Sequence, residues 1–307
     1  MVRLEVKRRL GEADIAALST LLHLAAVADD HRPLGEHQWL DLVHGGRQGM
    51  AGFVASEPGH GHPVGYAQVS RSGSSWAVEL VVDPHHRDAA STVGSDLLAA
   101  ALAEVAAQGG GHVHLWVPKP GPAHDRMTAA NGLVRGRELY QMRRPLPFGP
   151  EGAAPGLPTR AFRPGQDEDA WLEVNNRAFS WHPEQGGWDL PTLRRREEEP
   201  WFDPDGFLLH ERDGRLAGFC WTKVHSDLTP ALGEIYVIAV DPDFQGEGLG
   251  RRLVLAGLRW LAAAGLATAM LYVDAGNGPA LALYRELGFH VDHVDRAYVG
   301  DVAPRGD

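Results

Sequence analysis

The residues best suited to bind a ligand form a glycine-rich turn, Gln245-Gly246-Glu247-Gly248-Leu249-Gly250. A β-branched run ending at Val240 precedes this turn and an apolar helical pattern follows it, so the turn is predicted to join a strand to a helix. The first amides of a helix have no intrahelical partner, and glycines let a ligand approach the backbone. Such a turn favours an anion, and a phosphate or pyrophosphate is the simplest ligand.

The spacing of the glycines narrows the kind of phosphate ligand. No Gly-Lys-Ser/Thr follows the turn, and the spacing is one residue short of the dinucleotide pattern Gly-x-Gly-x-x-Gly. The turn fits Q/R-x-x-G-x-G/A, and a second pattern follows downstream, in which Asn277 begins a helix and Tyr284 is followed by Gly288-Phe289. Together the two patterns resemble the GCN5-related N-acetyltransferases. The resemblance implies acetyl-CoA as acyl donor.

Acetyl transfer to an amine needs a base for the amine, a partner for the oxyanion and a proton for the leaving thiolate. Glu234 opens the strand that leads into the turn and is our candidate general base, either directly or through a water. Tyr284 and Tyr298 are alternative general acids. Alternatively, these residues have no catalytic role: the glutamate is a solvated strand-end residue, and the two tyrosines pack in the core.

Further contacts are implied by the resemblance. It covers nearly the whole chain and extends to tandem members of the family that acetylate the cysteinyl amine of 1D-myo-inositol 2-(L-cysteinylamino)-2-deoxy-glucopyranoside. The implied substrate contacts are Glu36, Glu184, Lys223 and Glu234. The implied CoA contacts are Leu80, Val81, Val82, Ile238, Ala239, Val240, Gln245, Gly246, Glu247, Gly248, Leu249, Gly250, Arg251, Asn277 and Tyr284.

Composition limits the other function classes. The net charge of −11 argues against broad binding to nucleic acid or anionic membranes. No apolar run approaches the ~20 residues of a membrane span, and no signal-peptide core is present, so we expect a cytoplasmic protein. We also expect it to be a monomer and to act on a small-molecule amine. The single cysteine, Cys220, lies in an apolar run and is expected to be a buried hydrophobe.

Sixteen histidines raise the question of a metal site. The close pairs are His60 with His62, His85 with His86, and His112 with His114. None is accompanied by a His-Glu-x-x-His pattern or by a zinc-type Cys/His spacing, so the sequence predicts no metal.

The chain divides near its middle. Residues 145–158 are rich in proline and glycine and are predicted to form a stiff linker between an N-terminal domain, 1–144, and a C-terminal domain, 159–307. Three landmarks recur at a nearly constant offset: Gly65 with Gly218, Asp83-Pro84 with Asp241-Pro242, and Gly132 with Gly288. We therefore predict a tandem duplication of one α/β domain. The resemblance implies that each copy has a mixed, mostly antiparallel sheet flanked by helices.

The first copy has lost the glycine pattern, because residues 85–94 keep only Gly94 and place Arg87 in the Gln245 position. We expect this copy to bind CoA weakly or not at all and to do no chemistry.

The predicted strands of the first copy are 4–6, 51–56, 64–70, 76–82, 112–117 and 133–142, and its helices 12–28, 35–43, 91–107 and 123–131. Those of the second are strands 160–162, 206–211, 215–223, 233–240, 268–273 and 289–299, with helices 167–179, 190–198, 249–264 and 279–286.

Two alternatives stay open. A related acetyltransferase could act on a protein N-terminus, a polyamine or an aminoglycoside. A non-catalytic acyl-CoA sensor would need the turn but not Glu234 or the tyrosines.

Overall fold

The computed structural model describes residues 2–29, 33–35, 39, 42, 49–72, 75–88, 91–147, 149, 156–181 and 185–306. Their contacts divide the chain into two compact units. Unit 1 consists of Met1–Glu138 with Val294–Asp307, and unit 2 of Leu139–His293. The helix predicted at 35–43 lies largely outside the described residues.

In unit 1 the sheet order is β1-β2-β3-β4-β5-β12-β6, with all described pairs antiparallel except β4 with β5. The strands are β1 (Arg3–Lys7), β2 (Ala51–Ser56), β3 (Gly65–Ser72), β4 (Ser75–Val82), β5 (Gly111–Pro118), β6 (Val134–Pro145) and β12 (His290–Val302). The helices are α1 (Glu12–Asp29), η1 (Pro84–His86), α3 (Val93–Ala107) and α4 (Pro122–Ala130).

Unit 2 repeats this order of elements. Its sheet runs β6-β11-β10-β9-β8-β7, and only β10 with β11 is parallel. The strands are β7 (Arg160–Ala161), β8 (Phe207–Arg212), β9 (Arg215–His225), β10 (Leu232–Val240) and β11 (Thr268–Asp274). The helices are α5 (Glu168–Ala178), α6 (Leu190–Glu197), η3 (Pro204–Gly206), η4 (Pro242–Phe244), α7 (Leu249–Ala263) and α8 (Gly278–Glu286). The mixed, mostly antiparallel sheets expected from the sequence are thus present in both units.

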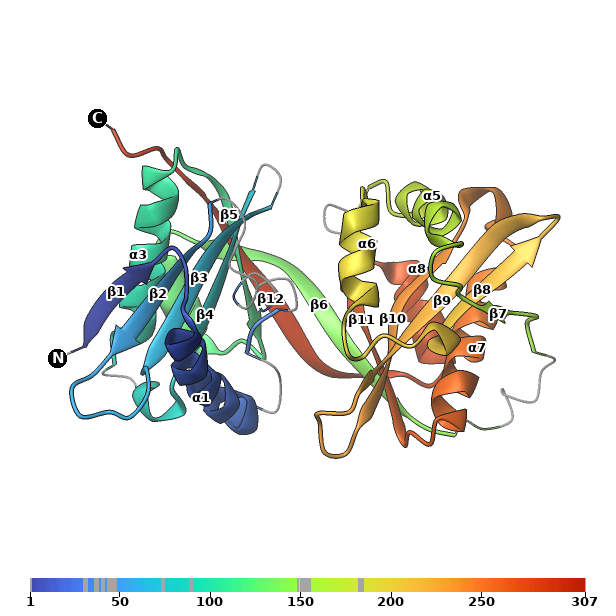
Figure 1. The fold of residues 1–307 in the computed structure, drawn as a ribbon, viewed down its shortest axis with the longest axis horizontal. Helices are drawn as coiled ribbons and strands as arrows, with labels where there is room; N and C mark the ends of the chain where they lie inside the picture. The colour runs from blue at the N-terminus through green and yellow to red at the C-terminus, as the bar shows by residue number, and fades with distance from the viewer. Residues whose placement is uncertain are drawn as a thin grey trace. The chain divides into compact units, whose positions relative to one another are not determined.

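Each sheet is covered on both faces because its strands alternate two sets of apolar side chains. In unit 2, Cys220 and Ile235 pack with Leu253 of α7, while Trp221 and Val237 pack with residues of α5 and α6. Figure 1 shows α5, α6, α7 and α8 around the sheet of this unit. In unit 1, one cluster joins the sheet to α3 and another joins it to α1. This two-faced burial matches the near-continuous apolar runs of the central strands.

The strand partners correct one prediction. The strand predicted at 133–142 was assigned to the first copy. In the structure β6 does lie beside β12 at the end of the unit 1 sheet, but its residues Leu139–Pro145 belong to unit 2 and pair with β11. Conversely, the end of β12 pairs with β5 of unit 1 from Asp295 to Val302. The sequence could not reveal this exchange, because an apolar alternation fixes which face a strand buries but not which neighbour it pairs with.

The predicted linker is partly integrated into unit 2. Leu146 and Leu157 are buried in the core that contains α7, and the Leu146 amide donates to the Ala267 carbonyl over 2.8 Å. The residues between them are largely outside the described part of the chain.

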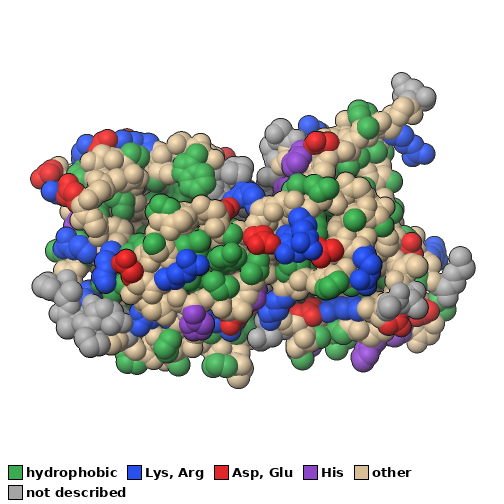
Figure 2. All heavy atoms as spheres, turned by 180° about the vertical axis from the view of Figure 1, so that it is seen from behind, with side chains coloured by type: hydrophobic (Ala, Val, Ile, Leu, Met, Phe, Trp, Pro, Cys, Tyr) green, Lys and Arg blue, Asp and Glu red, His purple; other side chains and the backbone are tan. Residues whose placement is uncertain are grey.

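The described surface carries charges of both signs (Figure 2). On the face shown in Figure 2, described acidic and basic side chains are interspersed. Among the described residues, no helix is both long and apolar enough to cross a membrane.

Candidate active site

The glycine-rich turn leads from η4 into α7. Gly246 and Gly248 have φ values of +86° and +73°, in the left-handed region that favours glycine, and Gly248 is the N-cap of α7. A Cβ added to either residue would meet no heavy atom within 4 Å, so the glycines are required by the backbone conformation and not by packing. The α7 amides that follow lack intrahelical partners, which suits them to an anion.

Buried Asp241 fixes the residues that precede the glycine-rich turn. Its Oδ1 accepts from the Asp243 amide at 2.9 Å, and its Oδ2 accepts from Arg177 Nη1 at 2.9 Å. Asp243 in turn pairs with Arg177 and Arg215 at 3.0 and 2.8 Å. Gln245 Nε2 donates to the Val240 carbonyl at 3.3 Å. These contacts preorganise the turn before any ligand arrives.

Strand β10 separates from β11 just before the turn. The two strands pair only at Gly233 with Ala269 and at Glu234 with Met270, whereas β10 continues to pair with β9. The register with β9 shifts between Ile235 and Val237, which is a β-bulge at the intervening residue. Beyond Glu234 the sheet therefore opens on the β11 side. The opened segment contains Ile238, Ala239 and Val240, where the sequence predicted CoA contacts.

Glu234 lies at the start of this opening and is 7% exposed. Its Oε2 accepts from His225 Nε2 at 2.7 Å, and its partner across the ladder is Lys223 of β9. The Lys223 ammonium lies 4.0 Å from the Trp201 ring centroid and 5.1 Å from that of Tyr236, a cation–π arrangement that directs the charge. A buried carboxylate with one oxygen held by a histidine keeps its second oxygen for a proton or an ammonium group.

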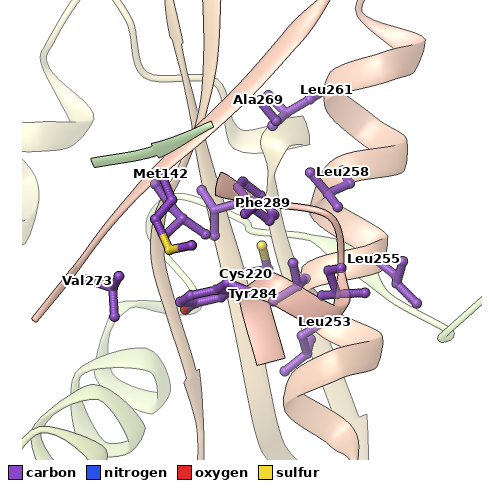
Figure 3. Close-up of a cluster of buried hydrophobic side chains, with 14 of the residues drawn as sticks. Met142, Cys220, Leu253, Leu255, Leu258, Leu261, Ala269, Val273, Tyr284 and Phe289 are labelled. Atoms are coloured by element: carbon purple, nitrogen blue, oxygen red, sulfur yellow. The ribbon is translucent and has the colours of Figure 1, made fainter. Parts of the chain in front are cut away.

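Tyr284 lies in the core of unit 2 near Cys220 and Phe289 (Figure 3). Its ring meets Phe289 edge-on with centroids 5.9 Å apart. Burial raises the pKa of Tyr284 to about 12, so the hydroxyl is protonated at neutral pH. Cys220 is fully buried, as predicted, and burial raises the pKa of its thiol to about 12.

Tyr298 lies in unit 1, because β12 pairs there with β5. Its side chain is 1% exposed and its hydroxyl donates to Asp125 Oδ1 at 2.8 Å. This corrects the placement of Tyr298 in the sheet of the second copy. Tyr284, in contrast, shares unit 2 with Glu234 and the turn.

The remaining predicted contacts have mixed surroundings. Asn277 caps α8, its Oδ1 accepting from the Ala280 amide at 3.1 Å. Glu247 forms an exposed ion pair with Arg212. Arg251 is half-buried in the first turn of α7.

Two predicted substrate contacts, Glu36 and Glu184, lie outside the described residues.

Unit 1 keeps the scaffold of this site but not its charged residue pair. Gly65 opposes Val82 as Gly218 opposes Val240, so Leu80, Val81 and Val82 match the opened segment of unit 2. Lys223 lies five residues after Gly218 on β9 and pairs with Glu234. The residue five positions after Gly65 on β3 is Ser70, which pairs with Ala77.

The turn that leads into α3 also differs from the turn that leads into α7. Strands β3 and β4 pair without a bulge. The N-cap of α3 is Thr92 with a φ of −100°, whereas the N-cap of α7 is a left-handed glycine. The unit with the glycine turn is therefore also the unit with the Lys223–Glu234 pair.

Sequence reasoning missed two parts of this arrangement. His225 gave no signal, because its link to Glu234 depends on strand register, nine residues away along the chain. The bulge at Tyr236 was also not foreseen, because it depends on the pairing of β10 with β9.

Comparison with known proteins agrees with these features. Residues 170–289 match the model of the acetyltransferase (GNAT) family. The chain is 46% identical over 280 residues to a mycothiol acetyltransferase from Acidimicrobium ferrooxidans, covering 90% of each chain. It is 45% identical over 302 residues to one from Thermobispora bispora, covering 97% of this chain and 99% of the relative.

The fold is likewise similar to that of a tandem GNAT protein from the clavulanic acid biosynthesis pathway. The TM-score is 0.72 at 18% identity, covering 99% of this chain and 100% of that one. This likeness supports the fold of two tandem domains predicted from the repeated landmarks. With the identity to curated relatives across nearly its full length, the chain belongs to the mycothiol acetyltransferases, a family of tandem GCN5-related N-acetyltransferases.

Proposed function

We propose that unit 2 transfers the acetyl group of acetyl-CoA to the cysteinyl amine of 1D-myo-inositol 2-(L-cysteinylamino)-2-deoxy-α-D-glucopyranoside, the last step of mycothiol biosynthesis. The observation that carries the proposal is the buried Glu234, held by His225 at 2.7 Å, at the point where β10 opens toward the glycine turn. The curated relatives' name supports the pathway, and the chemistry of the site supports acetyl transfer.

The donor is held at two places. The pyrophosphate of CoA rests on the amides that begin α7 after Gly248, with Gln245 and Arg251 beside it. The pantetheine arm extends along the opened segment of β10, where amides near Ile238 and Val240 pair with it as a further strand would. The thioester carbonyl then lies near the bulge, and a backbone amide there stabilises its oxyanion.

Proton transfer follows from the same geometry. The amine arrives as an ammonium ion, attracted by Glu234, and loses a proton to the free oxygen of that carboxylate directly or through one water. The amine nitrogen attacks the thioester carbonyl to form a tetrahedral intermediate and releases its second proton to solvent. The C–S bond then breaks, and the CoA thiolate takes a proton. Tyr284 supplies that proton and regains one from solvent, because it is the candidate acid that shares unit 2 with the turn. His225 is a positioning residue that fixes the Glu234 rotamer.

The acceptor is bound by charge and aromatic surface. Lys223 is held on the faces of Trp201 and Tyr236 and offers its ammonium to sugar hydroxyls, while Glu36 and Glu184 add carboxylates. Unit 1 does no chemistry, since Ser70 and Ala77 occupy the positions of the Lys223–Glu234 pair.

The test compares acceptors with the full-length protein. Acetyl-CoA turnover is measured with cysteinyl-glucosaminyl-inositol, a peptide N-terminus, spermidine and an aminoglycoside. A kcat/KM at least tenfold higher for the first acceptor supports the proposal, and no turnover with it removes the assignment. No turnover with any amine, together with tight acetyl-CoA binding, identifies an acyl-CoA sensor instead.

The stoichiometry of acetyl-CoA binding reports on unit 1. The intact chain is required, because an isolated N-terminal half would lack the β12 segment that pairs with β5. Calorimetry should give one tight site per chain, lost in a Gly248→Trp variant.

A further inference from the structure

We propose that unit 1 contains a Zn²⁺ site at a histidine cluster composed of Glu57, His60, His62, Asp83 and His86. The cluster joins the loop between β2 and β3 to the end of β4 and η1. It lies outside the acetyl-transfer site of unit 2, and the inference is independent of the proposed acceptor.

The first ligand set is His60, His62 and Asp83. One donor atom from each lies within 4.8 Å of the others. His62 Nε2 is 2.7 Å from Asp83 Oδ2, and the rings of His60 and His62 meet edge-on with centroids 4.9 Å apart. Zinc bonds of ~2.0–2.2 Å in a tetrahedron put donor atoms roughly 3.3–3.6 Å apart. Small side-chain rotations therefore bring all three donors onto one ion.

The second set, Glu57, His60 and His86, shares His60 with the first and meets the same 4.8 Å criterion. His86 Nε2 is 3.1 Å from Glu57 Oε2. Its other nitrogen, Nδ1, is buried with no hydrogen-bond partner among the described residues, and lies 3.5 Å from Asp83 Oδ1. Because buried polar atoms normally have a partner, this nitrogen is available as a fourth ligand.

The equivalent position in unit 2 holds a cation, which supports the assignment. Asp241, the counterpart of Asp83, has its charge balanced by Arg177 at 2.9 Å. Asp83 is fully buried and is surrounded by imidazoles in place of a guanidinium. A buried carboxylate is costly without a compensating charge. A divalent ion supplies that charge while the imidazoles stay neutral.

The donor types select the ion. Imidazole nitrogens with one or two carboxylates favour Zn²⁺ over Mg²⁺ or Ca²⁺, which prefer all-oxygen sets. The sequence concealed this set because Asp83 is 21 residues from His62 along the chain and belongs to no spacing pattern. The bound ion would tie the β2–β3 loop to the turn that replaces the glycine-rich turn in unit 1.

The experiment uses tag-free full-length protein stripped with a chelator. Zn²⁺ binding is measured by calorimetry and by metal analysis after dialysis, with Mg²⁺ as the chemical control. We expect one Zn²⁺ per chain, and a raised Tm with Zn²⁺ but not with Mg²⁺. His60→Ala and His62→Ala should each weaken Zn²⁺ binding at least tenfold. Co²⁺ substitution should give the visible absorption of a tetrahedral site.

His112→Ala is the matched control, because His112 is half-exposed on β5 and pairs with Asp301 at 2.9 Å, apart from the cluster. It should bind Zn²⁺ as the wild type does. His60 is exposed, so His60→Ala retains the fold, which circular dichroism verifies. The proposal is overturned if the wild type takes up no stoichiometric Zn²⁺, or if His60→Ala and His62→Ala bind it as tightly as His112→Ala.

Discussion

Gly250→Ala separates folding from CoA binding. Gly250 is the second residue of α7, and an added Cβ would meet only Val240 Cγ2, at 3.9 Å, which is an ordinary contact. Alanine also has the higher helix propensity, so the free energy of unfolding should stay unchanged or rise by up to ~1 kcal/mol. The same methyl group lies where a phosphate must approach the first amides. Losing one charge-assisted hydrogen bond costs about 1.5–3 kcal/mol of binding free energy, which raises the Kd for acetyl-CoA roughly 10- to 150-fold.

Two further glycines control for backbone strain. Gly248 and Gly265 have φ values of +73° and +83° and empty surroundings, so alanine at either should cost about 1–2 kcal/mol of stability. Only Gly248→Ala should also weaken acetyl-CoA binding, because Gly265 follows the far end of α7. Urea unfolding gives the stability and calorimetry gives the Kd. A Gly250→Ala protein that binds acetyl-CoA as tightly as the wild type would refute the placement of the pyrophosphate.

Other predictions concern packing, acid stability and the general acid. Gly257→Ala puts a Cβ 2.5 Å from Cys220 Sγ and should cost ~1–3 kcal/mol in urea unfolding, part of which Cys220→Ala restores; an unchanged midpoint would contradict this packing. Hydrogen bonds from Arg135 and Tyr298 lower the pKa of Asp125 to about 2, so its contribution to stability is complete above its ordinary pKa and disappears as pH falls toward 2. In the Asp125→Asn variant, the free energy of unfolding should fall less steeply between about pH 4 and pH 2 than in the wild type. The same fall in both proteins would exclude Asp125 as its source. Tyr284→Phe should lower kcat at least tenfold and Tyr298→Phe should not; the reverse result would transfer the acid role to unit 1.

Much of the fold was predictable because local patterns determine it. The strand–turn–helix at Val240, Gly248 and α7 was readable from β-branching, glycine spacing and an apolar helical face. Strand partnership was not readable, and so the exchange of β6 and β12 and the position of Tyr298 in unit 1 were missed.

The same distinction applies to the site. Glu234 was predicted because it begins the strand that leads into the turn, and Lys223 was implied by the family resemblance. Their pairing across the ladder and the contact with His225 depend on the register of β9 and β10. Contacts made by register or between loops leave little trace in one sequence, which also explains why the histidine cluster of unit 1 was not expected.

The most direct test of the account is single-turnover acetyl transfer by Glu234→Gln, with acetyl-CoA and cysteinyl-glucosaminyl-inositol both saturating. Glutamine keeps the size of the buried side chain and its bond to His225 but cannot accept the proton. General-base catalysis contributes about 100- to 10,000-fold, so the account predicts a rate reduced by that factor with the Kd for acetyl-CoA unchanged. A Glu234→Gln protein that transfers the acetyl group at the wild-type rate would contradict it.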